Sequence, residues 1–320
     1  MHAPTTPEIR TTCRRILELL LPYRRALPGD GDAPPSQDAL APQFAQIGEF
    51  VADGEPVVLT LPAFPCKSPN PEKVLGHLPD MGERVALRFL HELCTRIETV
   101  YAPGAKVLIC SDGHVFADLI GVRDDVVDEY AAALHDMICQ ESDRIDTFDL
   151  RHVYGELSIE DKRARLMREY GQSYDSLREE IHSDDNTVQL YRGISKFMEE
   201  DSVASEFPGS RSAWKRDCRA RAHGVILRSR AWGSLIKDVH PRSARMSIHP
   251  QPWGAEKFGL SLIGDSDGWV TPWHAVAVRE NGRFTLVKRS VAEARGELVC
   301  VGGMPSHYEF VQPSGVPVAG

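Results

Sequence analysis

The sequence lacks the features that mark several large classes of protein. It has no basic excess, since 46 acidic and 37 basic side chains leave a net charge of −9, whereas nucleic-acid-binding proteins need a basic surface. No uninterrupted apolar run reaches the roughly 18 residues of a membrane span. The first ten residues, MHAPTTPEIR, have neither the charged nor the apolar region of a secretory signal. We therefore expect a soluble, cytoplasmic protein with neither nucleic acid nor membrane as a partner.

Cysteine motifs and dinucleotide motifs are also missing. The seven cysteines are odd in number and scattered, and no C-x-x-C occurs, which argues against a disulfide framework and against a cysteine-ligated zinc. No G-x-G-x-x-G follows a predicted strand, so nothing indicates a nicotinamide or flavin dinucleotide. The sequence predicts no metal and no cofactor.

Hydrophobic patterning predicts the fold class. Amphipathic helices are expected at residues 8–25, 80–100 and 124–140. Short β-branched runs, typical of buried parallel strands, lie at 56–61, 106–110 and 144–150. This alternation predicts an α/β fold with a doubly wound, Rossmann-like parallel sheet, because such connections are long enough for right-handed crossovers.

The remaining patterns predict a helical insertion and a C-terminal mixed β/α part. We expect N-terminal helices and the Rossmann-like half over residues 1–150, a helical segment over 151–240, and a β-rich part over 241–320 that completes the active site. A Gly/Pro-rich linker, LPGDGDAPPS, follows the first helix, and an Asn-Gly pair at 281–282 predicts a hairpin.

Two loops follow predicted strands at the sheet edge where ligands of such folds bind. The first, LPAFPCKSPNPEK, carries Lys67, Ser68, Asn70 and Lys73, which suit a phosphate or carboxylate. A solvated proline-rich turn is the competing interpretation. The second loop offers Ser111 and Asp112, with His114 next to them, as an acid–base pair or as a plain turn.

Two further groups suggest anion binding and proton transfer. Arg192 and Lys196 share one helix face, and their repulsion would be relieved by an anion, although a solvated basic face is the commoner arrangement. Histidines and cations recur at the ends of later predicted strands. This last group comprises Arg245, His249, Lys257 and His274.

Here the sequence resembles a known family. The stretches LPAFPCKSPNPEKVLG, APGAKVLICSDGHVFADLIGV, SIHP, KFG and TPWHAV are similar, in order, to motifs of the isonitrile synthases, and the similarity runs from about residue 40 to 290. The resemblance implies a lyase-type reaction of secondary metabolism. In it the α-amine of tyrosine or tryptophan condenses with ribulose 5-phosphate, whose ketone carbon becomes the isonitrile carbon. It implies no metal and no redox cofactor. An Fe(II)- and 2-oxoglutarate-dependent oxygenase is the usual pathway companion.

The resemblance also suggests roles for the candidate residues. Lys67, Ser68 and Lys73 would hold the phosphate, with Asn70 and Ser111 beside them and with Arg192 and Lys196 as a second clamp. Proton transfers would fall to Asp112, His249 and His274. Lys257 would polarise a carbonyl or hold the carboxylate, with Arg245 as a further anion-binding residue.

Three alternatives stay open at this point. An N-formylating enzyme would share the fold. A non-haem iron oxygenase would use His182-x-Asp184 and His240, with Arg245 pairing a co-substrate. A non-catalytic sugar-phosphate sensor would keep the anion loops without the proton-transfer residues. The sequence does not distinguish tyrosine from tryptophan, and it does not reveal the oligomeric state or the final product.

Overall fold

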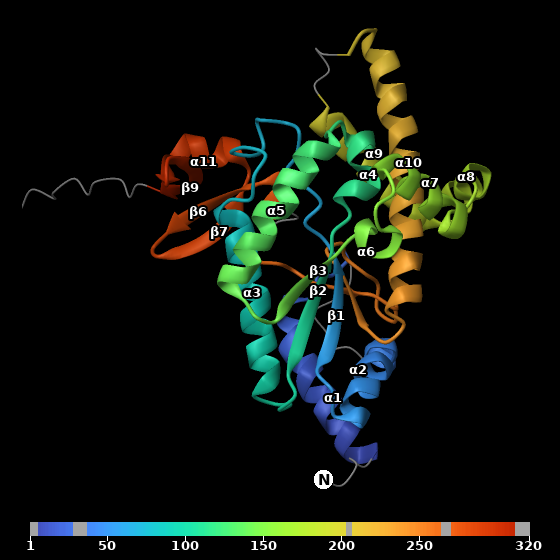
Figure 1. Cartoon of the computed structure of the whole chain (residues 1–320), viewed down its shortest axis with the longest axis vertical. Helices are drawn as coiled ribbons and strands as arrows, with labels where there is room; N and C mark the ends of the chain where they lie inside the picture. The colour runs from blue at the N-terminus through green and yellow to red at the C-terminus, as the bar shows by residue number, and fades with distance from the viewer. Residues whose placement is uncertain (1–5, 28–36, 203–206, 264–269, 311–320) are drawn as a thin grey trace, which may run out of the picture.

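Five short parallel strands form a sheet in the middle of the computed structural model, which describes residues 6–27, 37–202, 207–263 and 270–310 (Figure 1). The strand order is β3-β2-β1-β4-β5, and every pair is parallel. The strands are β1 (Val57–Pro62), β2 (Ala105–Cys110), β3 (Ile145–Phe148), β4 (Ala244–Ser247) and β5 (Phe258–Gly259). The order reverses between β1 and β4, so the loops after these two strands flank the topological switch point, where ligands of doubly wound sheets bind.

The helices before and between the first strands bury one apolar side each. They are α1 (Thr6–Leu20), η1 (Leu21–Tyr23), η2 (Gln37–Leu40), α2 (Ala41–Asp53), α3 (Met81–Glu98), α4 (Gly113–Ile120) and α5 (Asp124–Glu141). The predicted first helix ends earlier than expected, at Leu20, because Pro22 lacks the N–H that an α-helix needs. Apolar residues of these helices pack with Leu59, Leu61 and Ile109 into the main core.

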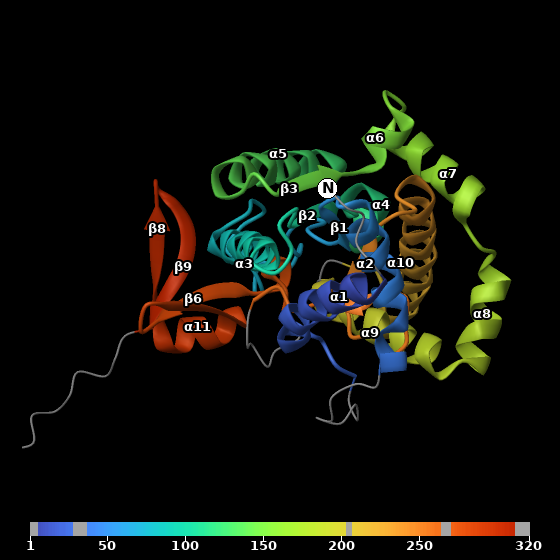
Figure 2. The same ribbon diagram turned by 90° about the horizontal axis from the view of Figure 1, so that it is seen from below.

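A helical segment is inserted between β3 and β4, as predicted. It comprises α6 (Leu150–Tyr154), α7 (Ile159–Tyr170), α8 (Tyr174–Ser183), α9 (Asp185–Asp201) and α10 (Arg211–Val239). The long helix α10 packs on the sheet, since Trp232 stacks on Phe148 at 5.5 Å and donates to the carbonyl of Cys110. Figure 2 shows α7 and α8 outside α10, on the side away from the C-terminal strands.

The C-terminal strands form a second, mixed sheet with the order β7-β6-β9-β8. Its strands are β6 (Val276–Glu280), β7 (Arg283–Val287), β8 (Gly296–Val301) and β9 (Met304–Phe310). The helix η4 (Pro272–His274) precedes this sheet, and α11 (Arg289–Arg295) connects β7 to β8. The predicted hairpin is present, because Asn281 and Gly282 both adopt the positive φ that its turn requires. Figure 2 shows this sheet beside α3, at one side of the molecule.

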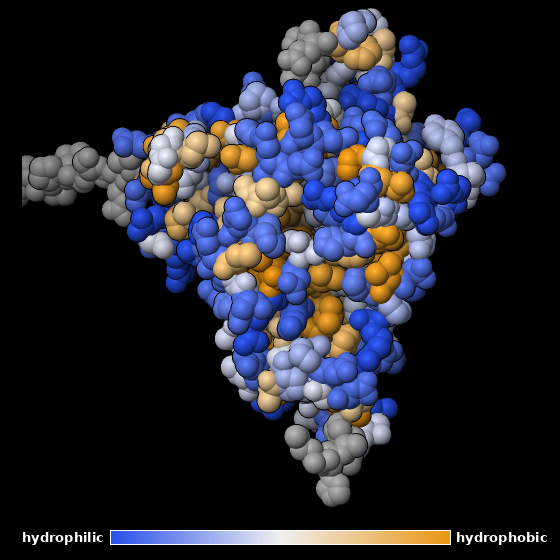
Figure 3. Space-filling view, in the orientation of Figure 1, coloured by the Kyte–Doolittle hydropathy of each residue, from blue (hydrophilic) through white to orange (hydrophobic). Residues whose placement is uncertain are grey.

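The predicted α/β class, with its parallel sheet, helical insertion and mixed C-terminal part, is confirmed. The β-rich segment expected at 241–320 is divided between the two sheets. Ala244 pairs with Leu59, which places β4 and β5 in the first sheet. Residues 28–36 of the expected linker lie outside the described residues. No helix in the described part of the chain is long and apolar enough to cross a membrane. Figure 3 shows that hydrophilic side chains cover most of the face seen in Figure 1.

Candidate active site

The loops after β1 and β2 are held against each other at the carboxyl edge of the sheet. The Ser111 hydroxyl donates to the carbonyl of Phe64 at 3.0 Å, and Phe64 adopts a φ of 55°, a strained value for a bulky residue. Gly113 allows this approach, because a Cβ there would lie 2.1 Å from the Pro65 carbonyl oxygen. Backbone strain and close packing of this kind concentrate at functional sites.

Asp112 is the most perturbed carboxyl group of this edge. Removal of water from the buried carboxyl raises its pKa to about 7, and its Oδ1 atom has no hydrogen-bond partner within the described residues. The residue stands at the N-cap of α4, yet its side chain makes no capping hydrogen bond. Asp112 is therefore half ionised near neutral pH and can both accept and donate a proton.

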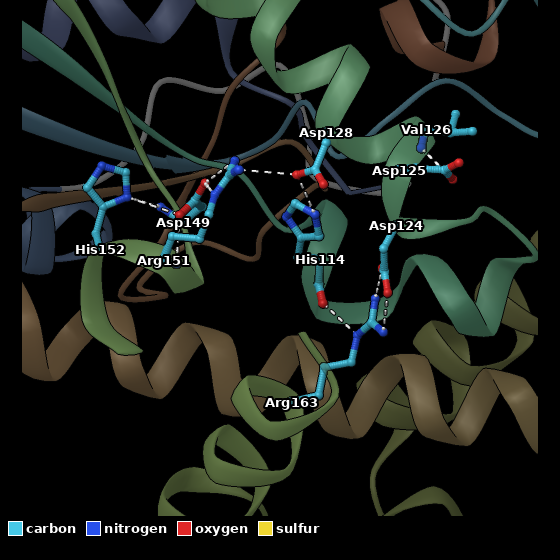
Figure 4. A network of polar contacts seen from close by, with 9 residues as sticks. All are labelled: His114, Asp124, Asp125, Val126, Asp128, Asp149, Arg151, His152 and Arg163. Carbon is cyan, nitrogen blue, oxygen red and sulfur yellow. Dashed lines mark hydrogen bonds and ion pairs between the residues drawn. The ribbon is translucent and has the colours of Figure 1, made fainter. Parts of the chain in front are cut away.

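His114 does not form the expected pair with Asp112. Its imidazole Nε2 faces Asp128 Oδ1 on α5 at 3.2 Å, and burial lowers its pKa (Figure 4). Arg163 of α7 donates to the His114 carbonyl at 2.7 Å and pairs with Asp124. This network ties α4, α5 and α7 together, so His114 belongs to the support of α4 and not to the acid–base group.

Lys67 also differs from its predicted role. Its ammonium group is fully buried, 2.9 Å from Asp80 Oδ2, 2.7 Å from Glu83 Oε2 and 3.0 Å from the Pro272 carbonyl oxygen. These three acceptors take all three donors of the ammonium group, so none is left for a phosphate. The structure therefore places Lys67 in a buried charge cluster with Asp80 and Glu83, and not beside the other cations of the predicted site.

The other polar residues of the β1 loop meet the end of α9. Ser68 Oγ donates to Asp201 Oδ2 at 2.9 Å, and the Lys73 ammonium pairs with Asp201 Oδ1. Asn70 donates to the carbonyl of Glu200 at 2.9 Å. The structure thus brings Ser68, Asn70 and Lys73 together, but around a carboxylate that the sequence analysis did not consider.

His274 contacts the same carboxylate. Its Nε2 is 3.4 Å from Asp201 Oδ2, and its Nδ1 is 3.0 Å from the hydroxyl of Thr271. The ring also makes an edge-to-face contact with Phe197 of α9 at 4.8 Å. His274 is therefore held on three sides by groups from η4 and α9.

His249 follows β4 and is electrostatically linked to the cations around it. The residue is exposed at one side, yet many protein atoms surround its imidazole ring. Burial, followed by repulsion from Arg25, Lys257 and His274, lowers its pKa to about 4. His249 is consequently a neutral imidazole at neutral pH.

Arg245 and Lys257 lie side by side on the face of the sheet that α10 covers. The register of β4 and β5 pairs Met246 with Phe258, which makes Arg245 and Lys257 neighbours one residue earlier. Both side chains reach Gly233 of α10, since a Cβ there would lie 3.6 Å from Lys257 Nζ and 3.9 Å from Arg245 Nη2. Arg245 pairs with Glu256 at 3.1 Å, whereas burial and then Arg245 lower the pKa of Lys257.

Arg25 adds a cation that the sequence analysis missed. Its guanidinium donates to the backbone carbonyls of Ile248 at 2.6 Å and Val270 at 3.3 Å, and burial lowers its pKa. Arg25 and Lys257 make no carboxylate ion pair within 4.0 Å among the residues that the structure describes. Partly buried cations without a carboxylate partner attract anions.

The structure does not bring Arg192 and Lys196 into this group. Arg192 is exposed, and Lys196 is 78% exposed with its ammonium 3.7 Å from Glu200 Oε1. They form a solvated helix face, which is the arrangement that the sequence analysis weighed against a second phosphate clamp.

The residues of the iron-oxygenase alternative are also dispersed. His182 contacts the Arg178 carbonyl, Asp184 caps α9, and His240 packs against Phe148. No group of three or more potential metal ligands occurs among the described residues. The expected facial arrangement is therefore not formed by these residues.

The molecule is an α/β protein with a doubly wound sheet, and the loops at the carboxyl edge of this sheet carry a carboxyl group with one unpartnered oxygen, two histidines and several cations. The chain belongs to the family described as pyoverdine/dityrosine biosynthesis protein, whose sequence model matches residues 47–299.

Relatives of known name show the same family. An L-tyrosine isonitrile synthase of Pseudomonas aeruginosa is 44% identical over 306 residues, covering 92% of this chain and 93% of that enzyme. The L-tryptophan isonitrile synthase AmbI2 of Fischerella ambigua is 42% identical over 280 residues, covering 87% and 85%. The crystal structure of the PvcA protein from Pseudomonas aeruginosa superposes with a TM-score of 0.88 at 43% identity, covering 94% of this chain and 100% of that one. The resemblance to the isonitrile synthases is thereby confirmed, and the chain is an enzyme of that family.

Proposed function

We propose that this enzyme converts the α-amine of tyrosine or tryptophan into an isonitrile, with ribulose 5-phosphate as the source of the added carbon, in secondary metabolism. Both amino acids are supported by the names of relatives, which are L-tyrosine and L-tryptophan isonitrile synthases. The observation that carries the proposal is that His249 lies within electrostatic reach of Arg25, Lys257 and His274, while Asp112 follows another strand of the same sheet. Arg245 lies next to Lys257 and completes the group of cations.

The first step of the proposed reaction, deprotonation of the amine, requires a base. The amine of a free amino acid is protonated at neutral pH and attacks a ketone only after it has lost that proton. Asp112, whose pKa burial raises to about 7, is the stronger proton acceptor of the two candidates, since burial and the nearby cations lower the pKa of His249 to about 4. The amine and the ketone then combine to an imine with loss of water.

The later steps need a group that both gives and takes protons. Dismantling the sugar requires protonation of leaving oxygens and removal of protons from carbon. Asp112 suits this double task, because burial raises its pKa to about 7 and keeps both forms populated near neutral pH. For the former ketone carbon to remain on the amino-acid nitrogen as the isonitrile carbon, both of its carbon–carbon bonds must break as the sugar fragments and its phosphate is released.

Both proposed substrates carry anionic groups, and the cations lie on the β4 and β5 side of the site. Lys257 has no carboxylate within 4.0 Å among the described residues. We assign this side to the phosphate or the carboxylate. Lys67 has no part in this binding, because its donors are all used internally.

The deciding experiment is mass spectrometry of a reaction that contains the purified protein, ribulose 5-phosphate labelled at its ketone carbon, and both tyrosine and tryptophan. A labelled isonitrile, trapped with a tetrazine, supports the proposal and names the amino acid. A labelled formamide that forms without a trappable isonitrile indicates N-formylation instead. Absence of any labelled product, with substrate binding retained, favours a sensor and overturns the proposed reaction. Asp112→Asn is the matched control, since it should bind substrates but form no product.

A further inference from the structure

Asp201 is a carboxylate in a place where carboxylates are disfavoured. It is the last residue of α9, where the helix dipole repels negative charge, and it is only 2% exposed. Burial alone raises the pKa of an aspartate, but hydrogen bonding and attraction from His274 and then from Lys73 hold the pKa of Asp201 below its usual range. The residue is therefore kept ionised by partners that come from two other segments of the chain.

The contacts of His274 distinguish its two ring nitrogens. Nε2 faces the Asp201 carboxylate, which only accepts hydrogen bonds, so Nε2 carries a proton in both charge states of the ring. Nδ1 faces the Thr271 hydroxyl at 3.0 Å, and a hydroxyl can either donate or accept. The ring can thus gain or lose a proton at Nδ1 without leaving a polar group unpaired.

We propose that Asp201 is the positioning residue of His274, which fixes the imidazole with its Nε2–H toward the carboxylate and leaves Nδ1, opposite Thr271, as the nitrogen that exchanges a proton in the reaction. The role of His274 in proton transfer rests on the proposed function, whereas the pairing with Asp201 does not. Asp201 acts only through His274 and needs no contact with a substrate.

Other charged groups surround this pair. Lys73 competes with His274 for Asp201, and Glu200 lies 3.4 Å from the Lys73 ammonium. His249 is coupled to His274 from the β4 side. Lys67 pairs with Asp80 and Glu83 and also donates to the carbonyl of Pro272, the first residue of η4. Ser68 adds an uncharged donor to Asp201.

This arrangement predicts which nitrogen of the neutral His274 ring carries the proton in each of two variants. Asp201→Asn replaces the carboxylate next to Nε2 by an amide, which can turn an N–H group toward the ring, so the preference for the Nε2–H form should be lost. Lys73→Met leaves the carboxylate in place, so the Nε2–H form should be kept. The measurement is the long-range proton–nitrogen NMR spectrum of histidine-labelled protein, in which His274→Gln identifies the signals.

Glu200→Gln is the matched control, because it removes a neighbouring acid that does not face His274, and it should keep the Nε2–H form. Wild-type spectra should show Nε2 as the protonated nitrogen of the neutral ring. A wild-type ring protonated at Nδ1, or an unchanged Nε2–H preference in folded Asp201→Asn, overturns the pairing. If Asp201→Asn does not fold, the wild-type tautomer still decides.

Catalysis gives a separate measurement. Asp201→Asn should lower kcat with little change in either KM, because Asp201 positions His274 without contacting a substrate. An unchanged kcat in an Asp201→Asn protein whose NMR spectrum shows the altered ring overturns proton exchange at His274 in the reaction. Failure of the wild-type protein to form an isonitrile refutes the proposed function, and the NMR spectra still test the pairing.

Discussion

Replacement of Lys67 by methionine tests whether its cluster serves stability or binding. Methionine keeps most of the volume but removes the ammonium group that lies between Asp80 and Glu83, both of which are buried. Removal of one partner from a buried ion pair costs about 3–5 kcal/mol, because the remaining charge has lost its compensation. That is a large share of a typical unfolding free energy of about 5–15 kcal/mol.

The pH dependence sharpens this prediction. Burial, opposed by Lys67, raises the pKa of Glu83 from 4.5 to about 7. Between these values the folded wild-type protein binds a proton that the unfolded chain does not, so the unfolding free energy falls as the pH rises through this window. Without Lys67 the Glu83 carboxyl group holds its proton more strongly. The destabilisation by Lys67→Met should therefore be smallest near pH 5 and grow toward pH 8.

Thermal and denaturant unfolding of the two proteins measure the effect. At about 2 °C per kcal/mol for a chain of this length, Tm should fall by roughly 6–10 °C. Lys196→Met is the control, since its ammonium is 78% exposed and its loss should leave Tm nearly unchanged. A Lys67→Met protein with wild-type Tm and a raised KM for ribulose 5-phosphate would refute the reasoning and restore the phosphate-binding role.

Three further predictions concern the candidate site. Asp112→Asn should abolish product formation, and it should also remove the fall in unfolding free energy between about pH 4 and the raised pKa of about 7, which equilibrium unfolding at several pH values checks. Lys257→Met should raise the KM for the anionic substrate at least about tenfold, as expected for the loss of one charged hydrogen bond, and steady-state kinetics with each substrate varied in turn would show which anion it holds. Replacement of Arg192 by methionine should leave both KM values unchanged, because its side chain is exposed, and a raised KM would place the helix face in the binding site after all.

The sequence by itself determined the elements and the edge of the sheet at which they present their loops. Helical spacing and β-branched runs are local signals, and they placed β1, β2, β3, α3 and α5 within a few residues of where the structure has them. The positions of Ser111, Asp112 and His249 after strands followed from the same patterns. The Asn-Gly pair fixed the hairpin of β6 and β7, because its turn depends on two adjacent residues alone.

The partners of the charged residues were decided only by the tertiary structure. Lys67 and Lys73 look alike in the sequence, yet Lys67 is enclosed by α3 while Lys73 meets Asp201 at the end of α9. Asp201 carries no local signal, since an acid at a helix end usually faces solvent, and its partner Ser68 is 133 residues away. Charge neutralisation depends on distances between segments that only packing brings together, so no pattern of residue types could tell which cations remain for a substrate.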